Sequence, residues 1–146
     1  MEYISAKEFL KQPKEVQEVF LDWWKPSIGD LFSWIKKDDG YEHDLRKLEC
    51  CNSDNIVEMT NSFKGTNEGD RIPLLSEGQL RKFIEDKYDC KMMVEYTICE
   101  NIVIKLGKIN KITGSFGFDR KFTCHKNKFD LLKAYWVVAC EIAKGV

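Results

Sequence analysis

No segment of the sequence approaches the roughly 18 to 20 consecutive apolar residues that a membrane-spanning helix requires. The N-terminal stretch Met1-Glu2-Tyr3-Ile4 also has neither the basic start nor the apolar run of a secretory signal. Because we see no export signal, we interpret the six cysteines as reduced thiols and not as disulfides. The sequence therefore predicts a soluble protein of the cytoplasm with no membrane partner.

Suitable ligand spacing for a metal ion is also missing. Two adjacent pairs, Cys50-Cys51 and Cys124-His125, could in principle supply three thiolates and one imidazole to zinc. Structural zinc sites usually take ligands two to four residues apart, because neighbouring side chains seldom reach one tetrahedral centre. Neither pair has that spacing, so we expect no metal and no other cofactor.

Sequence signals for catalysis are equally scarce. Cys124 adjoins His125, but a catalytic Cys and His meet in space and are rarely neighbours in sequence. His43 lies between two acidic residues and could act as a base, although a solvated surface histidine is the commoner case. The glycines between Gly107 and Gly117 do not follow a phosphate-binding spacing. We assign no catalytic residue and expect a protein that is not an enzyme.

What the sequence does contain is the composition of a folded domain. The chain has 146 residues, of which 43% are hydrophobic and 32% are charged, which is a globular balance and not a disordered one. No internal repeat, low-complexity tract or long linker divides it. We therefore expect a single domain over residues 1–146.

Helix signals occur near both ends and in the centre. Capping boxes start at Ser5 and Ser76, and Asn127 or Asp130 can cap a final helix. Pro13 suits the opening turn of a second helix. Apolar residues then recur at helical spacing in three segments: Val16, Val19, Phe20, Trp23 and Trp24 in the first, Leu80, Phe83 and Ile84 in the second, and Leu131 to Ile142 in the third.

Strand signals fill the intervening segments. Five segments favour strands, namely Leu31–Ile35, Asn55–Thr60, Lys91–Ile98, Ile102–Leu106 and Phe116–Phe122. The polar stretch Tyr41–Asp54 has no clear assignment, and three apolar residues at helical spacing suggest a short helix there. Because helices and strands do not alternate regularly, we predict an α+β fold: a small, mostly antiparallel sheet packed against N-terminal, central and C-terminal helices.

Charge is segregated along the chain. Residues 1–100 contain 14 Lys and Arg against 21 Asp and Glu, whereas residues 101–128 contain seven basic residues against Asp119 alone. Phe116, Phe118 and Phe122 lie within this basic segment. Basic groups with aromatic residues can bind single-stranded nucleic acid, but three phenylalanines of one strand parity can also form the inward face of a strand, and surface lysines can simply protect a hairpin edge.

The candidate partner-binding residues come mainly from this basic segment. Trp24 is added because one member of the Trp23-Trp24 pair can lie at the edge of the core, where tryptophan often anchors a protein partner, although packing of both rings in the core is the favoured interpretation. The candidates are Trp24, Lys105, Lys108, Lys111, Arg120, Lys121 and Lys126.

Three segments resemble small, largely uncharacterised proteins encoded by phages and prophages of low-GC Gram-positive bacteria (Firmicutes). They are Ser5–Phe32 (SAKEFLKQPKEVQEVFLDWWKPSIGDLF), Ile72–Lys87 (IPLLSEGQLRKFIEDK) and Asp130–Ala143 (DLLKAYWVVACEIA). The excess of Lys over Arg, 19 to 4, is also typical of an AT-rich genome. The resemblance implies a bacterial cytoplasm as the setting and brings no catalytic residue with it.

The resemblance also implies a class of function. Small phage accessory proteins often bind a host protein, including antiviral defence effectors such as CRISPR nucleases. We therefore expect a phage or prophage protein that binds a host protein, with inhibition of a defence nuclease as one outcome. The alternative is a protein that binds nucleic acid or a small anionic ligand through residues 105–128.

Overall fold

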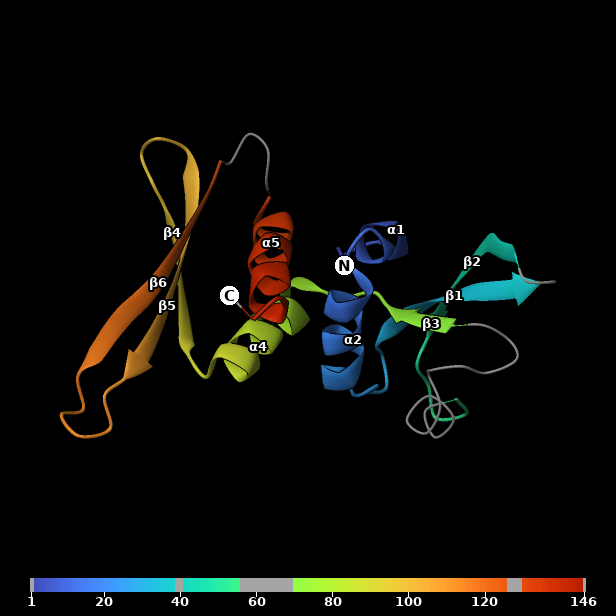
Figure 1. Cartoon of the computed structure of the whole chain (residues 1–146), viewed down its shortest axis with the longest axis horizontal. Helices are drawn as coiled ribbons and strands as arrows, with labels where there is room; N and C mark the ends of the chain where they lie inside the picture. Colours follow the sequence, from blue (N-terminus) through green and yellow to red (C-terminus); the bar gives the residue numbers. More distant parts are fainter. Residues whose placement is uncertain (1, 39–40, 56–69, 126–129, 146) are drawn as a thin grey trace. The chain divides into compact units, whose positions relative to one another are not determined.

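The computed structural model describes residues 2–38, 41–55, 70–125 and 130–145. These residues form four helices and two three-stranded antiparallel sheets, so the predicted α+β fold class is confirmed (Figure 1). Contacts group the chain into two compact units, one of residues 4–75 and one of residues 76–146 together with residues 1–3. Each unit has its own sheet, whereas the sequence suggested one. The single domain over residues 1–146 stays a prediction.

The N-terminal unit contains two helices and the first sheet. Helix α1 (Ala6–Leu10) is followed by α2 (Lys14–Trp23), β1 (Leu31–Asp38), β2 (Tyr41–Cys50) and β3 (Asp70–Pro73), with the strands in the order β2-β1-β3. As predicted, Ser5 caps α1, and its hydroxyl accepts the backbone N–H of Glu8 at 3.2 Å. The rings of Phe9 and Phe20 meet in the core with their centroids 6.0 Å apart.

Two expectations in this unit have different outcomes. The short helix suggested within residues 41–54 is wrong, because residues 41–50 form β2 and pair along β1 from Asp38↔Tyr41 to Leu31↔Cys50. Of the expected strand Asn55–Thr60, only Asn55 lies within the described residues, and it belongs to a turn. The backbone pairing of β2 thus overrides the helical spacing of its three apolar side chains.

The C-terminal unit is built from the predicted central helix, a sheet of three strands and the final helix. In chain order these are α4 (Glu77–Tyr88), β4 (Lys91–Tyr96), β5 (Asn101–Ile109), β6 (Phe116–His125) and α5 (Leu131–Ala143). The strands are antiparallel in the order β4-β5-β6. Both helix caps expected here are confirmed: Ser76 forms a capping box with Gln79, and Asp130 accepts the backbone N–H of Lys133 at 2.8 Å.

One face of this second sheet packs against the two helices. Ile102, Ile104 and Leu106 of β5 are fully buried, as are Val138 and Ala139 of α5. Figure 1 shows α4 and α5 on the same side of the β4-β5-β6 sheet. The side chains that alternate with this buried row belong to the opposite face, which we call the open face. Within the described ranges, no helix is both long enough and apolar enough to cross a membrane.

Candidate binding face

A β-bulge in β6 decides which side chains reach the open face. Residues directly opposite each other in an antiparallel pair share a face, and the register changes from Leu106↔Arg120 to Gly107↔Phe118. Asp119 is therefore the extra residue of the bulge, and the strand parity reverses across it. Phe122 lies on the helix-covered face opposite Ile104, whereas Phe118 lies on the open face. The prediction that Phe116, Phe118 and Phe122 share the inward face is therefore wrong.

Phe116 and Phe118 form an aromatic pair on the open face. Their ring centroids are 5.0 Å apart with an interplanar angle of 90°, which is a preferred edge-to-face arrangement. Phe116 lies over Gly107, where a Cβ atom would come within 2.4 Å of its Cζ atom. The absence of a side chain at Gly107 thus makes room for the ring. The two phenylalanines remain 46% and 45% exposed, so about half of each side chain is available for contact.

Two of the predicted basic residues flank this pair. Lys105 and Lys121 lie opposite each other on adjacent strands, and the ammonium of Lys105 is 5.4 Å from the centroid of the Phe118 ring. Lys105 also forms an ion pair with Glu95 at 2.8 Å. Among the residues that the structure describes, Lys121 has no carboxylate partner of this kind. The carboxylate of Glu95 offsets the charge of Lys105 but not that of Lys121, which lies opposite it. Lys121 therefore leaves a local positive excess beside Phe118.

The two other predicted basic residues of the strands, Lys108 and Arg120, lie away from this face. Lys108 and Arg120 stack on the ring of Tyr88, at 4.6 Å and 5.7 Å from its centroid. The hydroxyl of Tyr88 donates a hydrogen bond to Asp119 Oδ2 at 3.2 Å. Partial burial of the Tyr88 side chain is the main cause, and this hydrogen bond the second, of a pKa above the usual value of 10.0. These two cations therefore connect the hairpin to α4 through Tyr88, and they lie on the helix-covered face and not on the open face with Lys105 and Lys121.

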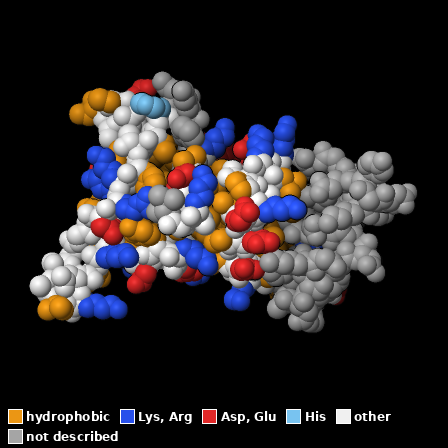
Figure 2. Space-filling view, viewed as in Figure 1, with side chains coloured by type: hydrophobic (Ala, Val, Ile, Leu, Met, Phe, Trp, Pro, Cys, Tyr) orange, Lys and Arg blue, Asp and Glu red, His pale blue; other side chains and the backbone are white. Residues whose placement is uncertain are grey.

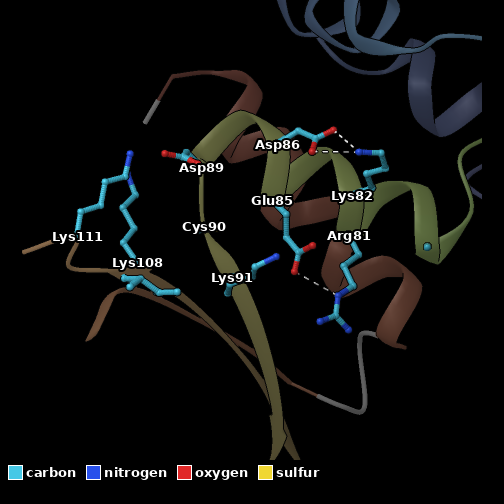
Figure 3. A pocket seen from close by; sticks show the side chains of 12 residues that line it. Arg81, Lys82, Glu85, Asp86, Asp89, Cys90, Lys91, Lys108 and Lys111 are labelled. Atoms are coloured by element: carbon cyan, nitrogen blue, oxygen red, sulfur yellow. Dashed lines mark hydrogen bonds and ion pairs between the residues drawn. The ribbon is translucent and has the colours of Figure 1, made fainter. Parts of the chain in front are cut away.

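A shallow hollow of about 1050 Å³ lies along α4, between the helix and the sheet (Figure 3). On the helix side its charges pair with each other: Arg81 with Glu85 at 3.5 Å and Lys82 with Asp86 at 2.9 Å. Lys108 and Lys111 line its strand side. Since acidic and basic groups alternate around it, the hollow lacks the single sign of charge that a dedicated anion site needs.

Two predicted binding residues have other outcomes. Trp24 is only 2% exposed, and its Nε1 donates to Asp30 Oδ2 at 3.2 Å. The prediction that Trp24 anchors a partner at the surface is therefore corrected: its ring is part of the core, and the neighbouring Trp23 is the partly exposed member of the pair. Lys126 lies outside the described residues.

The open face also contains residues that the sequence did not nominate. Besides Phe116 and Phe118 it includes Met93 and Ile109, both of which are exposed. Regular alternation along β6 could not place the two phenylalanines, because nothing local marks Asp119 as a bulge. The glycine at Gly107 was the available signal, since a glycine inside a strand often marks a bulge or a close approach.

The buried cysteines are not activated for chemistry. Burial raises the pKa of Cys51 and of Cys90 from 9.0 to about 11, and that of Cys140 to about 12. Such thiols stay protonated at neutral pH and are poor nucleophiles and metal ligands. The described part of the chain contains no group of three or more His, Cys, Asp or Glu side chains arranged to hold a metal ion.

Comparison of the chain with protein-family models, with curated proteins and with solved structures finds no match.

Proposed function

We propose that the chain is a non-enzymatic binding protein that recognises a host protein through the open face of the β4-β5-β6 sheet. The observation that carries the proposal is the half-exposed pair Phe116 and Phe118, fixed edge to face beside Lys105 and Lys121. Rigid aromatic side chains next to cations are typical of the central residues of protein interfaces. The resemblance to phage and prophage proteins supports a bacterial partner, such as a CRISPR nuclease or another antiviral defence effector.

The magnitude of the available contact supports a protein as the partner. Each phenylalanine exposes roughly 90 Å² of apolar surface, taking about 200 Å² for a whole aromatic side chain. Covering both rings would contribute about 4–5 kcal/mol at 25 cal/mol per Å². Association itself costs about 4–15 kcal/mol, so the pair needs further contacts around it. A protein surface that covers the whole open face provides them.

A pulldown with paired variants tests this proposal. The tagged chain is incubated with nuclease-treated lysate of a low-GC Gram-positive bacterium, and captured proteins are identified by mass spectrometry. We expect F118A and K121E to lose a stoichiometric host protein that the unchanged chain retains. The matched control is I98A, because Ile98 is fully exposed in a loop of the same unit. Equal capture by F118A and the unchanged chain would refute the proposed face.

A second candidate function is the binding of single-stranded nucleic acid or a small anionic ligand. Lys105 over the Phe118 ring, with Lys121 alongside, favours it, since bases stack on aromatic rings while cations hold the phosphates. However, Lys105 is already paired with Glu95, and Lys108 and Arg120 stack on Tyr88. Few cations therefore remain free for phosphates.

The two candidates differ in their dependence on salt. If Lys105 and Lys121 were the two phosphate contacts, the logarithm of affinity for a labelled single-stranded oligonucleotide would fall with the logarithm of salt concentration at a slope of about −1.4. Fluorescence anisotropy at several salt concentrations measures this slope. Submicromolar binding that F118A abolishes would favour the second candidate over the first.

A further inference from the structure

The hairpin between β5 and β6 is longer than the rest of its sheet. Strand β4 pairs only with residues 102–107 of β5. Beyond them, residues 108–117 pair only with each other, from Lys108↔Gly117 and Ile109↔Phe116 to the turn. We call residues 108–117 the arm, and Figure 1 shows it extending past the end of β4. A two-stranded ribbon has little intrinsic stability in water, so the arm needs support from its turn.

That turn is held by hydrogen bonds centred on one asparagine. The side-chain oxygen of Asn110 accepts the backbone N–H groups of Ile112 at 2.9 Å and Thr113 at 3.2 Å. The backbone of Asn110 bonds with Ser115 at 2.8 Å and with Gly114 at 2.7 Å. Gly114 has φ +70°, which glycine adopts without strain. The turn is therefore preorganised in one conformation.

This ordered turn displays an apolar side chain. Ile112 is 94% exposed, and Ile109 and Phe116 at the base of the arm are also exposed. Figure 2 shows hydrophobic and basic side chains together at the free end of the hairpin. The arm itself contains two lysines, Lys108 and Lys111, and no acidic residue. An apolar tip with cations behind it is complementary to an apolar groove that is bordered by carboxylates.

We propose that the arm is an anchor that inserts Ile112 into an apolar, acid-bordered groove of the partner protein. This inference rests on the proposed function and extends it, because the arm is continuous with the open face through Phe116 and Ile109. A preorganised turn loses little conformational freedom on binding, so an exposed isoleucine there contributes more affinity than one on a flexible loop. The arm also supplies the further contacts that the aromatic pair requires.

Photo-crosslinking tests the anchor. The photoreactive residue p-benzoylphenylalanine replaces Ile112, Phe118 or, as the control, Ile98, which is equally exposed in another loop of the unit. Each variant is irradiated in nuclease-treated lysate of a low-GC Gram-positive bacterium, and the products are analysed by mass spectrometry. We expect position 112 to crosslink a discrete host protein at an apolar segment flanked by Asp or Glu, and position 98 to give no such product.

The other outcomes separate the anchor from the proposed function. Crosslinks to one host protein from position 118 but not from position 112 would overturn the anchor alone. No protein crosslink from either position would overturn both. A product from position 112 that is nucleic acid or a second copy of the chain would also overturn the anchor. A second variant, I112K, should weaken capture of the crosslinked protein by about tenfold or more, and unchanged capture would contradict the proposal.

Discussion

The contact between Gly107 and Phe116 leads to a quantitative prediction. A methyl group at Gly107 would lie 2.4 Å from Phe116 Cζ and 3.0 Å from the carbonyl oxygen of Gly117, whereas ordinary contact begins at 3.4 Å. The ring must therefore move by about 1 Å, the difference between 3.4 and 2.4 Å. Displacing the buried half of Phe116, roughly 100 Å², costs about 2.5 kcal/mol. Replacing a strand glycine by alanine by itself stabilises the folded state by about 0.5–1 kcal/mol, which offsets part of this cost.

We therefore expect G107A to destabilise the sheet by about 1.5–2 kcal/mol. The matched control is G117A on the facing strand, where a Cβ atom would meet nothing within 4 Å. G117A should be neutral or stabilising by up to about 1 kcal/mol. Native-state hydrogen exchange of the β5 amide groups measures both changes in the sheet itself.

A double-mutant cycle with F116A tests the cause of this loss. If the ring is the obstacle, G107A should cost much less in the F116A background, because the displaced contact is already gone. A full penalty that persists without the ring would refute the reasoning and would place the clash at the Gly117 carbonyl. Stability of G107A equal to that of G117A would refute the close approach altogether.

Three further predictions concern the rest of the chain. First, a thiol reagent at pH 8 should modify the exposed Cys50 and Cys99 rapidly and the four buried cysteines only on unfolding, and C50S/C99S should abolish the fast phase. Because the pKa of Cys90 is raised from 9.0 to about 11 in the folded protein, this thiol loses its proton at a lower pH in the unfolded state. The stability measured by urea unfolding should therefore fall as pH rises between these two values. Second, W24A should lower the stability of the N-terminal unit by about 3–5 kcal/mol in urea unfolding, whereas W24F should cost less, because Trp24 is a core residue. Third, D130A should destabilise α5 by about 1 kcal/mol, measured by thermal unfolding against D130N, which retains a capping side chain.

Local sequence signals predicted the elements of the C-terminal unit well. The alternation from Ile102 to Leu106 predicted β5, and the capping residues Ser76 and Asp130 gave the starts of α4 and α5. These signals act within a few residues, so they do not depend on contacts with distant parts of the chain. The fold class followed from the order of the elements.

Features set by distant contacts could not be predicted in this way. Strand β1 pairs with β3, which begins more than thirty residues after β1 ends, so the division of the strands into two sheets leaves no local mark. Residues 41–50 have apolar side chains at helical spacing, yet their pairing with β1 makes them a strand. The helical stripe of α2 placed both Trp23 and Trp24 toward the core and could not say which ring is fully buried.

The bulge at Asp119 connects the fold to the proposed binding face. With unbroken alternation, Phe116 and Phe118 would lie on the same face as Phe122, against the helices, and the open face would lose its aromatic pair. The extra residue places these two phenylalanines on the open face. Asp119 itself accepts a hydrogen bond from the hydroxyl of Tyr88 on the helix side. One inserted residue thus both exposes two phenylalanines and ties the hairpin to α4. The aromatic pair on which the proposed binding face depends therefore reaches the open face only because of this one extra residue.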